Sequence, residues 1–305
     1  MGLFNISADS GNPGSGANPP PTPPPPVSTA PLKSGVYLRP WTESPTTLAA
    51  LPDLHPGVLR INYPGFPMIL ADQAEAARLV GLIESNIVYA RSIGALPLIV
   101  ATLKARLAPA TGADVIHDAI AVSDFYGKVA ARFPGCIWEI GNEQEIQSGG
   151  GDAALDAQTY AYSFNQLSYT IRMFDATATF VTAGTSGFHV DWIRAVLALT
   201  KPDAVGVHPY GTAPQDFAKA VWDINAHLPV YFTEYGLQNI SPQQVTDFFT
   251  YARGVVPLAV LFCLSDLSAD GGQKFGLLDA YGNRRPSYAA AKTAFALTVG
   301  GGANG

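Results

Sequence analysis

The chain has little charge and almost no cysteine. Only 14% of its 305 residues are charged, and 24 acidic side chains outnumber 18 basic ones. Proteins that bind nucleic acid need a basic surplus to neutralise phosphates, so a nucleic-acid partner is not expected. The two cysteines, Cys136 and Cys263, each lie inside an apolar run, where a thiol behaves as a small hydrophobic side chain. The composition favours a neutral or weakly charged ligand and leaves the redox compartment open.

Export and membrane signals are also missing. No apolar run is long enough to cross a bilayer, and no basic segment followed by an apolar one begins the chain, so we expect neither a membrane span nor a secretory signal. The location stays open between the cytoplasm and an exported or virion assembly. Residues 1–31 instead contain nine of the 25 prolines and one charged side chain, Asp9. Because this composition cannot build a core, we expect a disordered or extended tail, or an anchor for a protein partner.

Two common site motifs are absent. No G-x-G-x-x-G follows the first strand-like run, and residues 149–151 lack the Lys-Ser/Thr of a phosphate loop, which argues against an open doubly wound sheet. Residues 37–39 lack the His-x-His that a metal-dependent hydrolase barrel carries on its first strand, and no His/Asp/Glu cluster has ligand spacing. We predict no cofactor and no metal site.

From Gly35 onward, strand-like and helix-like runs alternate. Helical stripes such as Leu79, Ile83 and Ile87 lie between short apolar runs rich in β-branched residues. The strand-like runs span residues 36–39, 58–62, 96–102, 136–141, 178–184, 204–208, 230–234 and 258–264. Alternation predicts parallel β-α-β units, and a closed barrel needs eight strands. We predict an α/β fold, a (β/α)8 TIM barrel over residues 32–299, followed by a Gly-rich end over residues 300–305.

Two of these runs end in a carboxylate. Residues 137–143 read Ile-Trp-Glu-Ile-Gly-Asn-Glu, and residues 230–236 read Val-Tyr-Phe-Thr-Glu-Tyr-Gly. The site of such a barrel lies at the C-terminal ends of its strands, so Glu143 and Glu234 stand on the rim. Two carboxylates there suit the cleavage of a sugar bond. Glu139 shares strand parity with Glu143, and we interpret it as a buried structural partner of an arginine.

With these motifs the chain resembles the retaining glycoside hydrolases of clan A. Barrels of this clan carry an Asn-Glu acid/base pair on the fourth strand and a Glu nucleophile on the seventh. The similarity covers residues 35–297, nearly everything after the tail. His208-Pro209-Tyr210 matches the clan's His-x-Tyr on the sixth strand, and Arg60 matches its usual Arg on the second.

The resemblance implies a function and a separate role for each of the two glutamates. The chain would cleave O-glycosidic bonds of a poly- or oligosaccharide by double displacement, with Glu143 as acid/base and Glu234 as nucleophile. Arg60 and Tyr210 would favour the ionised form of Glu234, and a less polar setting would keep Glu143 protonated. The expected partner is therefore a carbohydrate substrate.

Further residues are candidates for contact with that substrate. Asn142 would bond the sugar hydroxyl next to the anomeric carbon, and His208 would support the same rim. His189 follows the fifth strand and is a candidate for a subsite. Tyr235, together with Trp41 and Tyr63, could stack on sugar rings or pack against the rim or the core. The sequence leaves these last two interpretations open.

Some features depart from the clan. The eighth run has no Trp where many clan members have one, and the third ends in Ala-Thr-Leu-Lys at 101–104 without the His of some families. The sugar, the linkage, endo or exo cleavage, and hydrolysis against transglycosylation therefore stay open. The alternative to an enzyme is a catalytically silent carbohydrate-binding or structural barrel within a larger assembly such as a phage tail.

Overall fold

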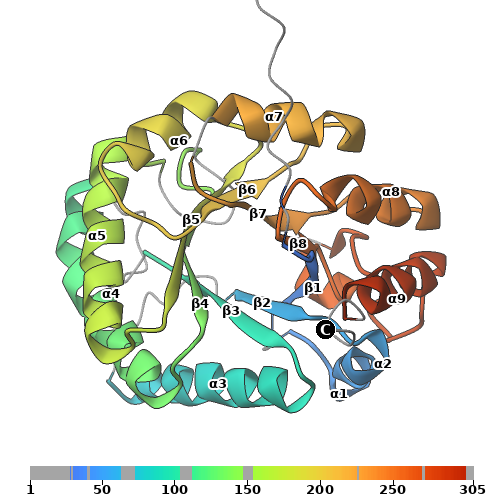
Figure 1. Ribbon diagram of the computed structural model, residues 1–305. Helices are drawn as coiled ribbons and strands as arrows, with labels where there is room; N and C mark the ends of the chain where they lie inside the picture. Colours follow the sequence, from blue (N-terminus) through green and yellow to red (C-terminus); the bar gives the residue numbers. More distant parts are fainter. Residues whose placement is uncertain are drawn as a thin grey trace, which may run out of the picture.

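The computed structural model describes residues 28, 30–39, 42–62, 73–103, 112–146, 154–224, 227–269 and 272–299. Within them, eight parallel strands pair in chain order and close into a barrel. Figure 1 shows the strands around the centre and the helices outside them. The predicted (β/α)8 TIM barrel is confirmed. The predicted tail over residues 1–31, apart from its last few residues, and the end over 300–305 lie outside the described residues.

Each predicted strand-like run overlaps one strand of the barrel. The strands are β1 Lys33–Leu38, β2 Val58–Asn62, β3 Leu96–Ala101, β4 Ile137–Asn142, β5 Thr179–Ser186, β6 Val205–His208, β7 Val230–Tyr235 and β8 Leu258–Leu261. Strand β8 ends short of the predicted Leu264. Beyond Leu261 the backbone makes single bonds to both neighbouring strands, from Phe262 N–H to the carbonyl of Tyr235 at 2.7 Å and from Leu264 N–H to that of Tyr37 at 2.9 Å. Between these two bonds, the carbonyl of Cys263 accepts from the N–H of Leu277 at 3.0 Å.

Helices cover the outside of the barrel, and the last of them lies beside the first two. They are α1 Pro45–Leu48, α2 Leu51–Leu54, α3 Gln73–Ser92, α4 Gly112–Arg132, α5 Ala157–Phe174, α6 Val190–Leu197, α7 Phe217–Ile224, α8 Pro242–Ala252 and α9 Pro286–Val299, with short 3-10 turns at Pro214–Asp216 and Asp266–Ser268. Helix α9 lies near α1 and α2 in Figure 1. The Tyr288 hydroxyl of α9 donates to the carbonyl of Ala50 at 3.1 Å, which ties the end of the described chain to its beginning.

Apolar side chains fill two layers. One lies inside the barrel and includes Val58, Leu98 and Val260; the other lies between strands and helices and includes Trp138 and Phe232. This division follows from strand alternation, since successive side chains point to opposite faces. Cys136 and Cys263 are both buried free thiols. Among the described helices, none combines the length and the apolar character that crossing a membrane requires.

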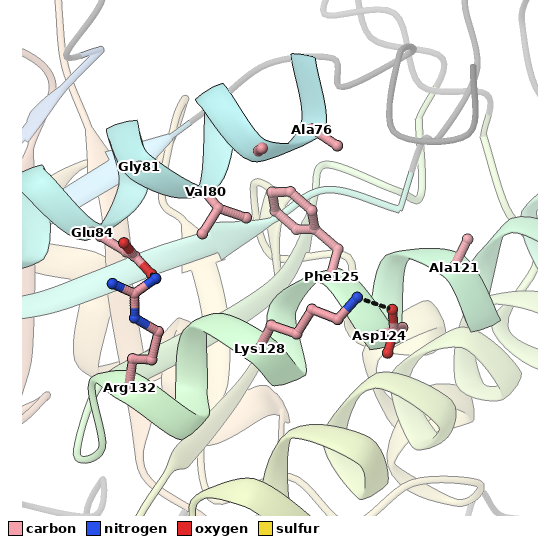
Figure 2. Close-up of a pocket in the computed structure, with 10 residues that line it drawn as sticks. Ala76, Val80, Gly81, Glu84, Ala121, Asp124, Phe125, Lys128 and Arg132 are labelled. Carbon is pink, nitrogen blue, oxygen red and sulfur yellow. Dashed lines mark ion pairs between the residues drawn. The ribbon is translucent and has the colours of Figure 1, made fainter. Parts of the chain in front are cut away.

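An open groove of about 660 Å³ runs between α3 and α4 on the outer layer. Figure 2 shows small side chains of α3 facing Phe125 of α4, with ion pairs along the rim. Lys128 pairs with Asp124 at 2.7 Å, and Arg132 with Glu84 at 2.6 Å. None of the described residues that line this groove is a predicted site residue.

Candidate active site

Strand β4 delivers Glu143 just beyond its last residue, Asn142. Gly141 has a φ of 86°, a conformation that glycine adopts readily, and Glu143 has a φ of 50°. The left-handed conformation of Glu143 costs roughly 1–2 kcal/mol, and its N–H donates to the carbonyl of Gly184 on β5 at 2.9 Å. This irregular backbone breaks strand alternation, so Asn142 and Glu143 both reach residues of the barrel interior.

A bulge in strand β7 directs the side chain of Glu234 into the site. Against β8, Phe232 pairs with Ala259 but Tyr235 pairs with Leu261, so β7 holds one extra residue between those pairs. Thr233 and Glu234 both contact interior side chains, whereas strict alternation would place them on opposite faces. A bulge re-aims side chains in this way and is frequent beside active sites.

The two glutamates lie close together. A carboxylate oxygen of Glu143, one of Glu234 and a ring nitrogen of His208 all lie within 4.8 Å of one another. The side chains of Glu143 and Glu234 are 18% and 11% exposed, so each still reaches solvent. Two carboxylates at this separation repel each other when both are ionised. The neighbouring cations therefore determine whether both can carry a charge.

The guanidinium of Arg60, from β2, is buried among three acceptors. Its Nε donates to Glu139 at 2.6 Å, and its two amino groups donate to Glu234 and Asn142, each at 2.7 Å. Burial alone would lower the pKa of Arg60, but the charges of Glu139 and Glu234 outweigh it and raise that pKa. The expected contacts of Arg60 with Glu234 and of Glu139 with an arginine are present, and the planar fork of the guanidinium fixes them together.

Tyr210 follows β6 and completes the surroundings of Glu234. Its hydroxyl donates to Glu234 Oε1 at 2.7 Å, the oxygen that Arg60 does not hold. Burial and the charge of Glu234 raise the pKa of Tyr210 well above its usual range, so the phenol stays a donor. Both oxygens of Glu234 are thereby oriented.

Glu143 does not lie in the less polar setting expected from the sequence. His208 Nδ1 lies 3.0 Å from Glu143 Oε1. Burial favours the neutral carboxyl, but the hydrogen bond and the charge of His208 outweigh it and lower the pKa of Glu143. The expectation that the surroundings alone keep Glu143 protonated is therefore wrong: its neighbour is a histidine that offers a proton.

His208 is fully buried and reaches Glu143 across β5. A Cβ atom at Gly184 would lie 2.1 Å from His208 Nε2 and 2.6 Å from Thr233 Oγ1, so only glycine leaves room for this ring. Burial lowers the pKa of His208, but the charge of Glu234 and the bonds to Glu139 and Glu143 together raise it to about 9. Sequence reasoning missed the roles of Gly184 and Thr233, because a glycine at the end of one strand and a threonine within another carry no local signal.

Two predicted substrate contacts lie elsewhere. Tyr235 points into the helical layer, where its ring stacks on Phe248 at 4.3 Å and only 4% of the residue is exposed, so its prediction as a substrate contact is wrong. The bulge in β7 is the reason, since it turns Tyr235 away from the interior. His189 stands before α6 with a side chain 44% exposed, and its Nε2 lies 2.9 Å from the carbonyl of Ser186. Its subsite role stays a prediction, and Trp41 and Tyr63 lie outside the described residues.

The group of Glu143, His208 and Glu234 also has a spacing that could hold a metal ion. Arg60 already donates to Glu234 at 2.7 Å, and His208 faces Glu143 at 3.0 Å. Because each carboxylate already has a hydrogen-bond partner on a protein side chain, we interpret the group as two carboxylates held by Arg60 and His208 and not as a metal site.

No protein-family model and no curated protein sequence matches the chain. Its fold, however, matches solved barrels that are glycoside hydrolases of families GH39 and GH5_18. The chain thus has the fold of the clan A glycoside hydrolases.

Three solved structures illustrate the similarity. A GH5_18 structure from Streptomyces cattleya in complex with GlcNAc has a TM-score of 0.70 at 14% identity, covering 90% of this chain and 82% of that one. A GH39 β-xylosidase from Caulobacter crescentus has a TM-score of 0.64 at 18% identity, covering 90% and 72%. A family 39 glycoside hydrolase from Bacteroides cellulosilyticus has a TM-score of 0.59 at 15% identity, and the alignment covers 88% of this chain and 64% of that enzyme.

Proposed function

We propose that the chain is a retaining glycoside hydrolase that acts by double displacement, with Glu143 as acid/base and Glu234 as nucleophile. The observation that carries this proposal is the approach of their carboxylate oxygens to within 4.8 Å. Retaining enzymes hold their two carboxyl groups about 5–5.5 Å apart, whereas inverting enzymes need about 6.5–9.5 Å to admit a water molecule. The short separation favours direct attack by Glu234.

The first step breaks the glycosidic bond. Glu143, once protonated, gives its proton to the leaving oxygen while the Glu234 carboxylate attacks the anomeric carbon. The C–O bond to the leaving group breaks, and an ester bond to Glu234 forms. Arg60 and Tyr210 each hold one oxygen of Glu234, at 2.7 Å, so the nucleophile is oriented before substrate arrives.

The second step releases the sugar. Ionised Glu143 takes a proton from water, the water oxygen attacks the anomeric carbon, and the ester bond to Glu234 breaks. The configuration of the product matches that of the substrate because two inversions have occurred. Glu143 thus alternates between acid and base, because the proton that it gives to the leaving oxygen in the first step is replaced by the one that it takes from water in the second.

For the substrate, we propose a β-linked neutral oligo- or polysaccharide. One similar structure is a β-xylosidase from Caulobacter crescentus, and a GH5_18 structure from Bifidobacterium longum is in complex with Manb1-4GlcNAc. The low overall charge of the chain suits an uncharged sugar.

The test is a screen with aryl β-glycosides of xylose, mannose, glucose and N-acetylglucosamine, followed by NMR of the anomeric proton in the first product formed. Retained configuration is expected. Glu234→Gln should abolish turnover. Glu143→Gln should lower it by roughly 10²–10⁴-fold, most for poor leaving groups, since these need general acid help.

Glu145→Gln is the matched control, because Glu145 lies in the same loop and its Oε1 accepts the backbone N–H of Ser186 and lies 3.7 Å from His189 Nε2. It should keep most of the activity. A 2-deoxy-2-fluoro aryl glycoside should trap a covalent ester on the peptide that contains Glu234. An inverted product would refute the mechanism. Sugar binding without hydrolysis of any substrate would instead support the silent barrel.

A further inference from the structure

Tyr37 is a buried aromatic residue inside the barrel that the proposed reaction does not use. It lies on β1 beside Arg60 of β2, its partner in the strand register, and both side chains are almost fully buried. The central carbon of the Arg60 guanidinium lies over the Tyr37 ring, 5.3 Å from the ring centroid. At this distance the negative face of an aromatic ring attracts a cation. The two residues therefore form a cation–π pair in the barrel interior.

The edge of the Arg60 guanidinium is already occupied. Its N–H groups donate to Glu139 at 2.6 Å and to Glu234 and Asn142 at 2.7 Å. One amino nitrogen also lies 3.4 Å from Nε2 of His208. The N–H groups of a guanidinium point outward in its plane, so these partners contact its edge and leave its two faces to other neighbours. The aromatic ring covers one of those faces.

The Tyr37 ring is itself held from several sides. Its hydroxyl accepts from Nε of Arg39 at 3.0 Å, and its centroid lies 4.7 Å from that of the Phe262 ring. The carbonyl of Tyr37 accepts from the N–H of Leu264 at 2.9 Å, which fixes the backbone. The ring therefore has little room to move when the guanidinium tilts toward it. An aliphatic side chain in this place would offer the buried cation no electrostatic attraction.

We propose that Tyr37 is a positioning residue whose ring keeps the guanidinium of Arg60 in the orientation in which it donates to Glu234 and Asn142. Without the ring, that face of the guanidinium would meet aliphatic groups or entering water, and its plane would be free to tilt. A tilt would loosen the proposed nucleophile, because Arg60 holds Oε2 of Glu234 at 2.7 Å. The effect on the reaction rests on the proposed function; the effect on Arg60 does not.

The test in the free protein is hydrogen exchange at Nε–H of Arg60, followed by NMR and assigned through bonds from the backbone of the same residue. Tyr37→Leu removes the ring, whereas Tyr37→Phe keeps the ring and removes the hydroxyl. Relative to the backbone amides of β2, exchange at Nε should quicken by roughly tenfold or more in Tyr37→Leu and stay near the unaltered rate in Tyr37→Phe. No change in Tyr37→Leu, or an equal change in both variants, would overturn the proposal.

Tyr126→Leu is the matched control. Tyr126 is also a buried tyrosine, and its hydroxyl accepts from the N–H of Thr102 at 3.1 Å. Its ring packs on Trp138 in the layer between strands and helices. This variant should lose stability without quickening the exchange of Arg60 relative to β2; an equal relative gain would mean a general loosening of the barrel and would count against the proposal. Thermal unfolding checks that each variant is folded, and Tyr37→Met replaces Tyr37→Leu if the latter does not fold.

The activity measurements separate this inference from the proposed function. If the chain hydrolyses a glycoside, Tyr37→Leu should lower kcat by roughly ten- to a hundredfold with little change in KM, because the buried ring acts on the reaction only through Arg60. Tyr37→Phe should keep most of the rate. A loss that falls on KM alone would refute the positioning role. If no glycoside is hydrolysed while the exchange of Arg60 still responds to Tyr37→Leu, the proposed function fails and the role of Tyr37 toward Arg60 stands.

Discussion

Gly184 lies on β5 between the ring of His208 and the hydroxyl of Thr233. Its hydrogen side chain admits the ring, and its N–H donates to Glu139 Oε1 at 3.0 Å. One small residue thus serves two neighbours of the proposed catalytic pair. The position is not replaceable, because the atoms that a larger side chain would meet belong to buried groups that are held on several sides.

Gly184→Ala is expected to displace His208 from Glu143. Overpacking of a filled interior costs about 1–3 kcal/mol, so the free energy of unfolding should fall by that amount. A misplacement of about 1 Å in such a site can cost roughly 10²-fold in rate, and a loss of that order is expected. Urea unfolding and initial rates of hydrolysis measure the two effects.

Gly81→Ala is the matched control, since the same methyl group meets nothing within 4 Å on helix α3. Gly in the middle of a helix is less favourable than Ala by about 0.5–1 kcal/mol, so this variant should be slightly more stable and equally active. If both variants behaved alike, the space at Gly184 would not be what positions His208.

Helix α5 packs against the barrel through buried side chains such as Phe164 and Leu167 and is also hydrogen-bonded to it through a tyrosine hydroxyl. Tyr160, fully buried, donates to the carbonyl of Ile140 on β4 at 2.7 Å and accepts from the N–H of Ala183 on β5 at 2.7 Å. The bond joins the two strands whose ends carry Glu143 and Gly184. The helix therefore braces the strands at the depth where the site begins.

Tyr160→Phe should weaken this brace without altering the shape of the side chain. Two buried backbone groups would lose their partner, which costs about 1–3 kcal/mol. We expect the urea midpoint to fall while the m-value stays constant, because the surface exposed on unfolding does not change. Tyr162→Phe, on the exposed face of the same helix, should stay within about 0.5 kcal/mol; an equal loss in both variants would contradict the bracing role.

The barrel as a whole concentrates ionisable groups from distant strands in its interior. Arg60 from β2, Glu139 from β4, His208 from β6 and Glu234 from β7 meet there, and each is largely buried. Ion pairs of this kind contribute little net stability over an apolar core, but removing one partner leaves an uncompensated charge. The stability of the molecule should therefore depend on pH through these groups.

We expect the stability of the folded state to fall at both low and high pH, through a different group in each case. The folded-state pKa of Glu139 is about 2 against 4.5 in the unfolded chain, so its contribution is present above about pH 4.5 and is lost as the pH falls toward 2. The pKa of His208 is about 9 against 6.5, so its contribution is complete below pH 6.5 and is lost as the pH rises through 9. From these groups, we expect greatest stability between pH 4.5 and 6.5, measured as Tm against pH.

The contribution of His208 to this pH dependence can be tested by measuring Tm against pH in His208→Asn. The alkaline fall in Tm should become shallower in this variant, because the raised pKa of the imidazole is no longer present. Glu139 keeps the ion pair with Arg60 in this variant, so most of the acid fall should remain. An unchanged alkaline slope would show that other groups set it.

Much of the barrel could be predicted from local patterns. The eight apolar runs, each ended by turn residues, predicted the strands because β-branched residues and period-2 alternation act within a few positions of the chain. Strand parity likewise placed Glu139 inside, and the resemblance to clan A placed Arg60 near Glu234. The direction of the Tyr235 side chain could not be predicted in this way, because the extra residue in β7 is a property of its pairing with β8 and not of β7 alone.

The sequence by itself thus determined the order of strands and helices and the identity of the two glutamates, because these depend on short-range pattern and residue type. Only the tertiary structure decided which side chain contacts the carboxylate of Glu143. The histidine in question lies 65 residues away, and its ring reaches the carboxylate through the space that Gly184 leaves open. Such a contact depends on barrel closure, on strand register and on the absence of one side chain, and no local segment of the chain encodes all three.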